Sequence, residues 1–64
     1  MKIILNGERR EVAAMTLAAL LTECGFSTRV ATAVNESFVP ATARAGHDLS
    51  DGDRIEVLAA MQGG

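Results

Sequence analysis

The chain has 64 residues, of which 48% are hydrophobic and 3% aromatic, and it carries a formal net charge of −2 with one cysteine and one histidine. This length predicts a single small domain, residues 1–64, whose aliphatic core leaves no room for an enzyme pocket beside it. The negative charge and the lack of Trp and Tyr argue against nucleic-acid binding, the single Cys and His argue against a disulfide or a metal cluster, and the short apolar stretches argue against a membrane span.

A β-hairpin is predicted at the beginning of the chain. Met1, Ile3 and Leu5 occupy alternate positions, which is the period of a strand with one buried face. The dipeptide at residues 6–7, Asn-Gly, is typical of a type I′ turn, because both central positions of that turn need a positive φ. Residues 9–12 then return antiparallel, and Val12 is expected on the inner face.

A short helix of about nine residues is predicted next. Its apolar residues fall on one side at helical spacing, namely Leu17, Leu20, Leu21 and Cys24. Thr16 stands where an N-cap is expected, and Gly25 suits a left-handed residue just after the end. Phe26 would then pack back on the helix. A helix this short needs a sheet against which to pack its leucines.

The second half of the chain predicts further strands. Residues 30–34 form a β segment whose facing is ambiguous, since its alanines could pack on a helix as well as its valines. A turn at 35–37 leads to a short strand at 38–39, which Pro40 terminates. An irregular connection with one helical turn follows, in which Leu49 anchors the loop. After a turn at 51–53, the last strand covers residues 54–60 with Ile55 and Val57 inward.

This order of elements predicts an α+β fold with a mixed four- to five-stranded sheet packed on one main helix. The helical crossover allows the last strand to lie parallel to the first. The other sheet face would carry Ile4 and Leu58, which form a candidate docking patch for a partner. The alternative is that they are ordinary exposed hydrophobic residues.

The chain ends Met61-Gln62-Gly63-Gly64, which suggests a flexible tail from about residue 60. Residues without a Cβ atom make a thin tether that can enter a narrow channel and present a carboxylate at its tip. Five extended residues reach about 17 Å, enough to enter a deep active site. We therefore expect Met61, Gln62 and Gly63 to thread a partner's channel. A frayed end without function is the alternative.

Several segments together resemble a known family over essentially the whole chain. They are Ile3-Ile4-Leu5-Asn6-Gly7-Glu8, Leu17-Ala18-Ala19-Leu20-Leu21, Val34-Asn35 before Phe38-Val39-Pro40, Leu49-x-Asp51-Gly52-Asp53-x-Ile55-Glu56, and Gly63-Gly64. In this order and spacing they resemble the ThiS family, the sulfur carriers of thiamine biosynthesis. The resemblance implies a ubiquitin-like β-grasp fold.

The resemblance also implies a mechanism. A ThiF-type adenylyltransferase would use ATP to adenylate the carboxylate of Gly64, and a sulfur-donor protein would supply the sulfur for a thiocarboxylate. That group would deliver sulfur to a ThiG-type thiazole synthase. The chain would thus be a carrier substrate and not an enzyme, with no bound cofactor or metal. We expect it to be cytoplasmic and monomeric when free, with no membrane or nucleic-acid partner.

Two positions depart from the family pattern. Members often have Gly after the Asn of the second hairpin, where this chain has Glu36, and Arg after the Pro, where it has Ala41. Glu36 leaves the type of that turn open. Ala41 weakens the expectation that this loop supplies a charged contact.

Other side chains favour structural interpretations. Cys24, on the leucine face of the helix, is expected to pack as an inert small hydrophobic residue, and His47 is expected to be solvated. The acidic residues could form one face for a basic partner, or a solvated face with turn-forming aspartates; they are Glu8, Glu11, Asp48, Asp51, Asp53 and Glu56.

Three alternative functions remain open from the sequence. The small subunit of molybdopterin synthase shares the fold and the diglycine end but is usually longer. A ubiquitin-like protein modifier would be conjugated to lysines through Gly64. A plain interaction domain would have no use for its two terminal glycines.

Overall fold

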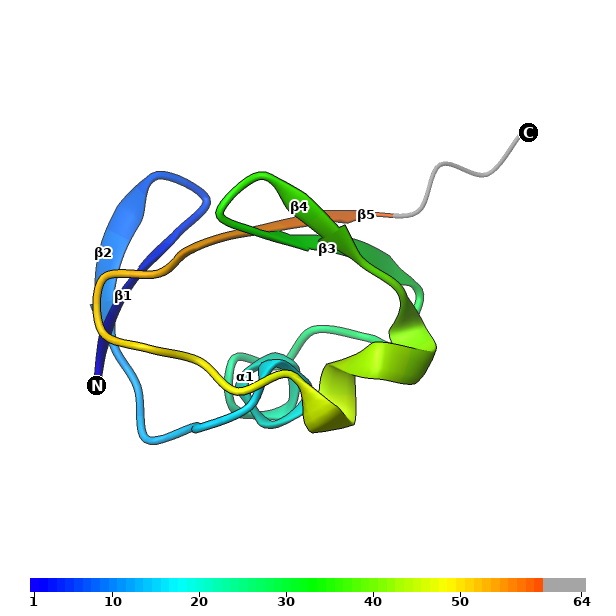
Figure 1. The fold of residues 1–64 in the computed structure, drawn as a ribbon, viewed down its shortest axis with the longest axis horizontal. Coiled ribbons are helices and arrows are strands. Elements are labelled where there is room, and N and C mark those ends of the chain that lie inside the picture. The colour runs from blue at the N-terminus through cyan, green and yellow to red at the C-terminus, as the bar shows by residue number, and fades with distance from the viewer. Residues whose placement is uncertain (60–64) are drawn as a thin grey trace.

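The structure, a computed structural model, describes residues 1–59 of the chain. A five-stranded sheet with the order β2-β1-β5-β3-β4 forms one layer, and the helical segments form the other (Figure 1). The elements are β1 Lys2–Leu5, β2 Glu8–Glu11, α1 Leu17–Glu23, β3 Val30–Val34, β4 Ser37–Val39, the 3₁₀ helix η1 Ala41–Gly46, and β5 Arg54–Ala59. Strand β5 runs parallel to β1 and antiparallel to β3, which confirms the predicted mixed sheet. The last residue of the predicted strand, Ala60, lies outside the described residues.

Both hairpin turns place two consecutive residues at positive φ. In the first turn φ is 50° at Asn6 and 85° at Gly7, as a type I′ turn requires. In the second, φ is 51° at Asn35 and 73° at Glu36, so the turn has the same signs although its second residue has a Cβ atom. The conformation of the second turn, which the sequence left open, therefore matches that of the first.

Helix α1 has the predicted cap at each end. The Thr16 hydroxyl accepts a hydrogen bond from the Ala19 amide (3.2 Å) at the first turn. At the other end the Phe26 amide donates to the Leu21 carbonyl (2.9 Å), and Gly25, at φ 78°, donates to Thr22 (3.2 Å). This pair of bonds is a Schellman motif, which ends the helix after seven residues instead of about nine.

The core lies between the sheet and α1. Its members are buried aliphatic residues from almost every element: Ile3, Leu5, Val12, Ala14, Leu17, Leu20, Leu21, Val34, Val39, Leu49, Ile55 and Val57. Strand β3, whose facing was ambiguous, buries Thr32 and Val34 and turns Ala31 outward. The reason is its register with β5, in which Thr32 and Val34 lie opposite the inward residues Val57 and Ile55.

Helix η1 occupies part of the connection that was predicted to be irregular with one helical turn. It begins after Pro40 and inserts one side chain, Arg44, into the interior, where only 6% of the residue is exposed. The Arg44 guanidinium donates to Thr32 Oγ1 (3.0 Å), to the Thr28 carbonyl (3.3 Å) and to the Val30 carbonyl. Strand β4 ends at Val39, opposite Thr32, so the guanidinium binds β3 where its neighbouring strand has stopped.

Within residues 1–59, no helix combines the length and the apolar composition needed to cross a membrane.

Candidate functional site at the end of strand β5

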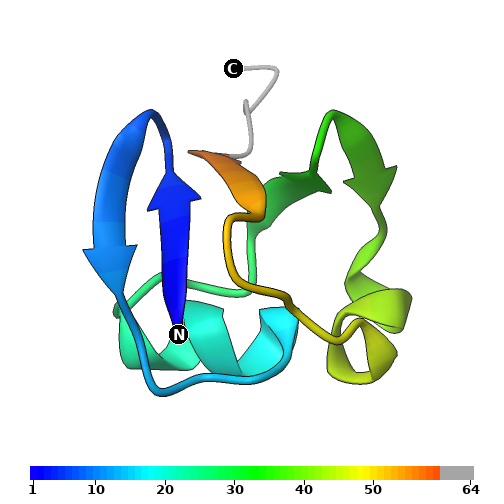
Figure 2. The same cartoon turned by 60° about the vertical axis from the view of Figure 1, so that its left-hand side comes forward.

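The residues with predicted chemistry, Met61, Gln62, Gly63 and Gly64, lie outside the described residues. The structure instead describes the strand from which they continue. Strand β5 lies between β1 and β3, so the rest of the sheet flanks it on both sides (Figure 2). The geometry of the last described residues of β5, Val57–Ala59, therefore determines where the tail starts.

On one side, the end of β5 rests on the beginning of β3. Val57 lies opposite Thr32, Leu58 opposite Ala31, and Ala59 opposite Val30. The carbonyl of Val30 accepts a hydrogen bond from the Arg44 guanidinium. A buried cation thus fixes the segment of β3 against which the last residues of β5 pair.

On the other side, the backbone pairing stops earlier. Strand β1 pairs with β5 only at Ile4 and Leu5, opposite Arg54 and Ile55. After that the Asn6 carboxamide continues the contact: its Oδ1 accepts from the Val57 amide (2.8 Å) and its Nδ2 donates to the Val57 carbonyl (3.1 Å). From the sequence, Asn6 was predicted only as a turn residue, because no local pattern reveals a contact with a residue 51 positions away.

The two residues of the predicted patch lie on the outer face of the sheet but at different levels of β5. Ile4 is half-buried and lies opposite Arg54, whereas Leu58 is 63% exposed and lies opposite Ala31. Glu56 stands between these two levels on the same face of the strand. The structure therefore does not join Ile4 and Leu58 into one continuous apolar surface.

Leu58 belongs instead to a different group, which we call the outer patch: Ala31, Ala33, Phe38 and Leu58. Phe38 is 69% exposed and lies opposite Ala33, and Leu58 lies opposite Ala31. Sequence reasoning missed Phe38. Its signal is the alternation within β4, because an inward Val39 requires an outward Phe38. The outer patch reaches the residue immediately before the last described residue of β5.

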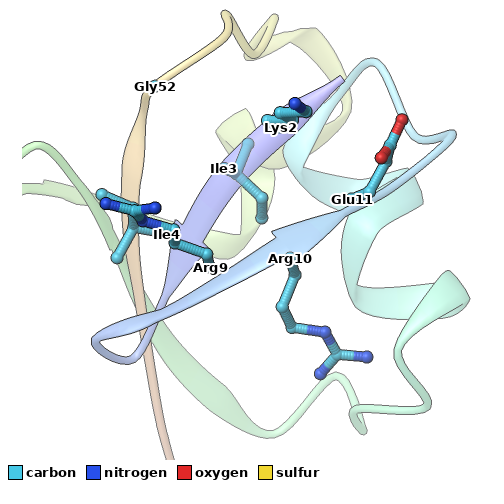
Figure 3. Close-up of a pocket in the computed structure, with 7 residues that line it drawn as sticks. All are labelled: Lys2, Ile3, Ile4, Arg9, Arg10, Glu11 and Gly52. Atoms are coloured by element: carbon cyan, nitrogen blue, oxygen red, sulfur yellow. The ribbon is translucent and has the colours of Figure 1, made fainter.

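A separate groove of about 460 Å³ runs along the β1–β2 hairpin (Figure 3). Charged side chains line most of it, and Ile4 contributes apolar surface; the charged residues are Lys2, Arg9, Arg10 and Glu11. Among the described residues that line the groove there is no cysteine, serine or histidine. Over residues 1–59, no three metal-binding side chains come together. The groove is thus an open surface that combines apolar area with charged groups.

The remaining candidates occupy structural positions. Cys24 is half-buried and packs against the core, as predicted. His47 is half-buried, so it is less solvated than predicted, and its carbonyl accepts a hydrogen bond from the Leu17 amide (3.0 Å).

Two of the acidic residues stabilise turns. Asp51 Oδ1 accepts from the Lys2 amide (2.8 Å), and Asp53 accepts from the Ser50 amide (2.8 Å) and from Asn35 Nδ2 (3.0 Å). For Asp53 the turn-forming interpretation is therefore the better one, whereas Asp51 ties its turn to β1.

Comparison with known proteins places the chain in a family. The model of the ThiS family matches residues 3–64. A curated protein named thiazole synthase, from Paramagnetospirillum magneticum, is 42% identical over 66 residues. This match covers all of the present chain but only 20% of the relative, so the chain spans about a fifth of that protein's length.

Solved structures show the same fold. The crystal structure of the thiamine biosynthesis protein ThiS from Geobacter metallireducens matches with a TM-score of 0.88 and 25% identity, and the match covers both chains completely. A solution structure of a thiamine biosynthesis protein from the same organism matches with a TM-score of 0.80 and 25% identity, over all of this chain and 88% of the other. The fold is thus a ubiquitin-like β-grasp, and the chain belongs to the ThiS family.

Proposed function

We propose that this protein is a sulfur carrier for thiazole formation in thiamine biosynthesis, and that its reactive group is the C-terminal carboxylate of Gly64. The observation that carries the proposal is that the family match extends to residue 64 and so includes Gly63 and Gly64. The relative named thiazole synthase supports the same pathway.

The chemistry requires activation because a carboxylate is a poor electrophile. One oxygen of the Gly64 carboxylate attacks the α-phosphorus of ATP, pyrophosphate leaves, and an acyl-adenylate forms. A sulfur nucleophile then attacks the acyl carbon and AMP leaves, so that sulfur replaces one carboxylate oxygen. A ThiF-type adenylyltransferase would catalyse the adenylation, and a sulfur-donor protein would supply the sulfur for the second step. The protein itself would act as a substrate throughout.

The described part of the chain supports this role in two ways. The end of β5 is held on both sides, by β3 and by Asn6, so the tail continues from a fixed point. The outer patch lies next to that point and exposes Phe38 and Leu58. An enzyme that takes the tail into its active site would therefore meet apolar surface beside the entrance.

The proposal is tested by intact mass spectrometry. We expect that incubation with a ThiF-type enzyme, ATP and a sulfide source adds the mass difference between one sulfur and one oxygen atom. A chain shortened by Gly63 and Gly64 should gain nothing, although it still ends in a carboxylate. The variant Gly64→Ala is the matched control of unchanged length, and its methyl group should obstruct the channel and suppress the gain.

The other outcomes identify the alternatives. No mass change in the wild-type protein with a competent enzyme would overturn the carrier role. Isopeptide-linked ladders on a denaturing gel would indicate a protein modifier. A stable complex with a large molybdopterin synthase subunit would indicate that the chain is the small subunit of that enzyme. Under the proposed function, the thiocarboxylate protein should transfer its sulfur to a ThiG-type thiazole synthase.

A further inference from the structure

We propose that Asn6 is a positioning residue, whose side-chain carboxamide fixes the end of β5 and thereby the starting direction of the tail. This inference rests on the proposed function for its consequence in activation. Its structural basis is a set of contacts between the first hairpin turn and the last strand.

The carboxamide takes the place of a peptide group that β1 no longer provides. The Asn6 amide donates to the Ile55 carbonyl (2.9 Å), which is the last backbone contact between the two segments. The next residue of β5 that faces this edge is Val57, because backbone groups alternate in direction along a strand. A carboxamide carries one acceptor and a donor, as a peptide group does, and Asn6 uses both on Val57.

Removing the carboxamide would remove two hydrogen bonds from the edge of β5 that faces β1. The β1 side would then hold β5 only as far as Ile55, and Val57 would join Leu58 and Ala59 in depending on β3 alone within the described residues. The Val57 side chain is buried and would keep the strand in the core. The expected effect is therefore a loosened end of β5 and not an unfolded protein.

The second hairpin provides a matched control. Asn35 also lies at positive φ in a two-residue turn, and its Oδ1 accepts from the Arg54 amide (2.9 Å). It thus makes the same kind of contact with β5, but at the beginning of the strand. Glycine suits positive φ at both positions, so Asn6→Gly and Asn35→Gly each preserve the turn and remove one carboxamide.

Amide hydrogen exchange measures directly how well the Asn6 carboxamide protects the Val57 amide. In Asn6→Gly we expect the Val57 amide to exchange about tenfold faster than in the wild type, after correction for global stability, because its acceptor is lost. In Asn35→Gly the Arg54 amide should respond and the Val57 amide should not. Asn6→Asp keeps an acceptor for the Val57 amide but places a carboxylate oxygen against the Val57 carbonyl, so it should restore only part of the protection. An unchanged Val57 amide in Asn6→Gly would overturn the proposal.

The rate of acyl-adenylate formation measures the functional consequence of losing the Asn6 carboxamide. With a ThiF-type enzyme and ATP, we expect the single-turnover rate of acyl-adenylate formation to fall about fivefold in Asn6→Gly, with an unchanged Kd for the enzyme. Asn35→Gly should keep the wild-type rate and Kd. Equal rates in the two variants would refute the positioning role. If the wild type itself is not activated, the proposed function fails, and the exchange of Val57 still decides whether Asn6 holds β5.

Discussion

Arg44 and Asn6 have the same structural role at two places in the sheet: each supplies side-chain hydrogen bonds to backbone groups. Each side chain binds backbone groups where a neighbouring strand has ended: Arg44 at Val30 of β3 and at Thr28 just before that strand, and Asn6 at Val57 of β5. All acceptors of Arg44 are neutral, and no carboxylate within residues 1–59 pairs with it. A buried guanidinium is tolerated here because its planar N–H groups match several oxygens at once.

The variant Arg44→Ala should therefore destabilise the protein by about 2–4 kcal/mol, because it leaves buried oxygens without donors and opens a cavity. Urea unfolding, followed by circular dichroism, measures the change. Arg9→Ala is the control, since Arg9 is exposed on β2, and it should change stability by less than about 0.5 kcal/mol. Equal effects of the two substitutions would show that the Arg44 contacts contribute no stability.

Residues whose roles depend on near neighbours were predictable from the sequence. Thr16 and Gly25 were assigned correctly because a helix cap involves residues three to five positions away. The contacts of Asn6 and Arg44 were not predictable, since they join residues 51 and 14 positions apart. Such contacts depend on how strands are placed beside one another, which no local pattern encodes.

At the scale of elements, the second hairpin carries a local strain that the first avoids. Glu36 has φ 73°, where a side chain is disfavoured, whereas Gly7 occupies the equivalent position of the first turn. The Glu36 carboxylate lies 3.6 Å from the Arg54 guanidinium, but both side chains are mostly exposed, so this ion pair adds little stability.

The variant Glu36→Gly should therefore stabilise the protein by about 1 kcal/mol, because relief of the backbone strain exceeds the loss of an exposed ion pair. Thermal unfolding at fixed ionic strength provides the measurement. Arg54→Thr removes the same ion pair without touching the turn and should be close to neutral. A destabilised Glu36→Gly protein would mean that the ion pair outweighs the strain.

Most strands and the helix were predicted because their apolar residues follow clear periods, as in Ile3 and Leu5 or Leu17 and Leu20. Strand β2 contains no apolar residue; its prediction at residues 9–12 depended on the preceding turn and was one residue too late. Strand β3 was harder, since its small alanines fit either face. Its facing is decided by the register with β5, which places Thr32 opposite Val57. The pattern of apolar residues thus indicates where the elements lie, and the pairing between strands determines which of their side chains face the core.

At the scale of the whole molecule, the two faces of the sheet differ. The helical layer covers one face of the sheet (Figure 1). The other face carries the outer patch, in which Phe38 and Leu58 are exposed. Because Leu58 adjoins Ala59, an enzyme that accepts the tail, as proposed, would come close to this surface. We expect the activating enzyme to cover the outer patch when it binds.

The variants Phe38→Ser and Leu58→Ser should each weaken binding to a ThiF-type enzyme by about 1–2 kcal/mol, with little effect on stability. Isothermal titration calorimetry measures the affinity. Met15→Ser is a matched control, because Met15 is 70% exposed and lies in the loop before α1, outside the outer patch. If all three variants bind equally well, the enzyme does not cover the outer patch.

The candidate site was therefore predictable in part. The tail residues with proposed chemistry, such as Gly64, are read directly from the end of the sequence and remain predictions. The apolar surface beside the tail was not predictable in its composition, since Phe38 and Leu58 lie 20 positions apart and share a face only through β3.

The central place of β5 has a mechanical consequence. An enzyme that draws the tail into a channel pulls on this strand along its own axis. The hydrogen bonds of β5 run across that axis to a neighbour on each side, so they share the load in shear and do not open one after another. The globular body would then resist a pull on its last strand, so that the enzyme of the proposed function would hold the tail without unfolding the protein.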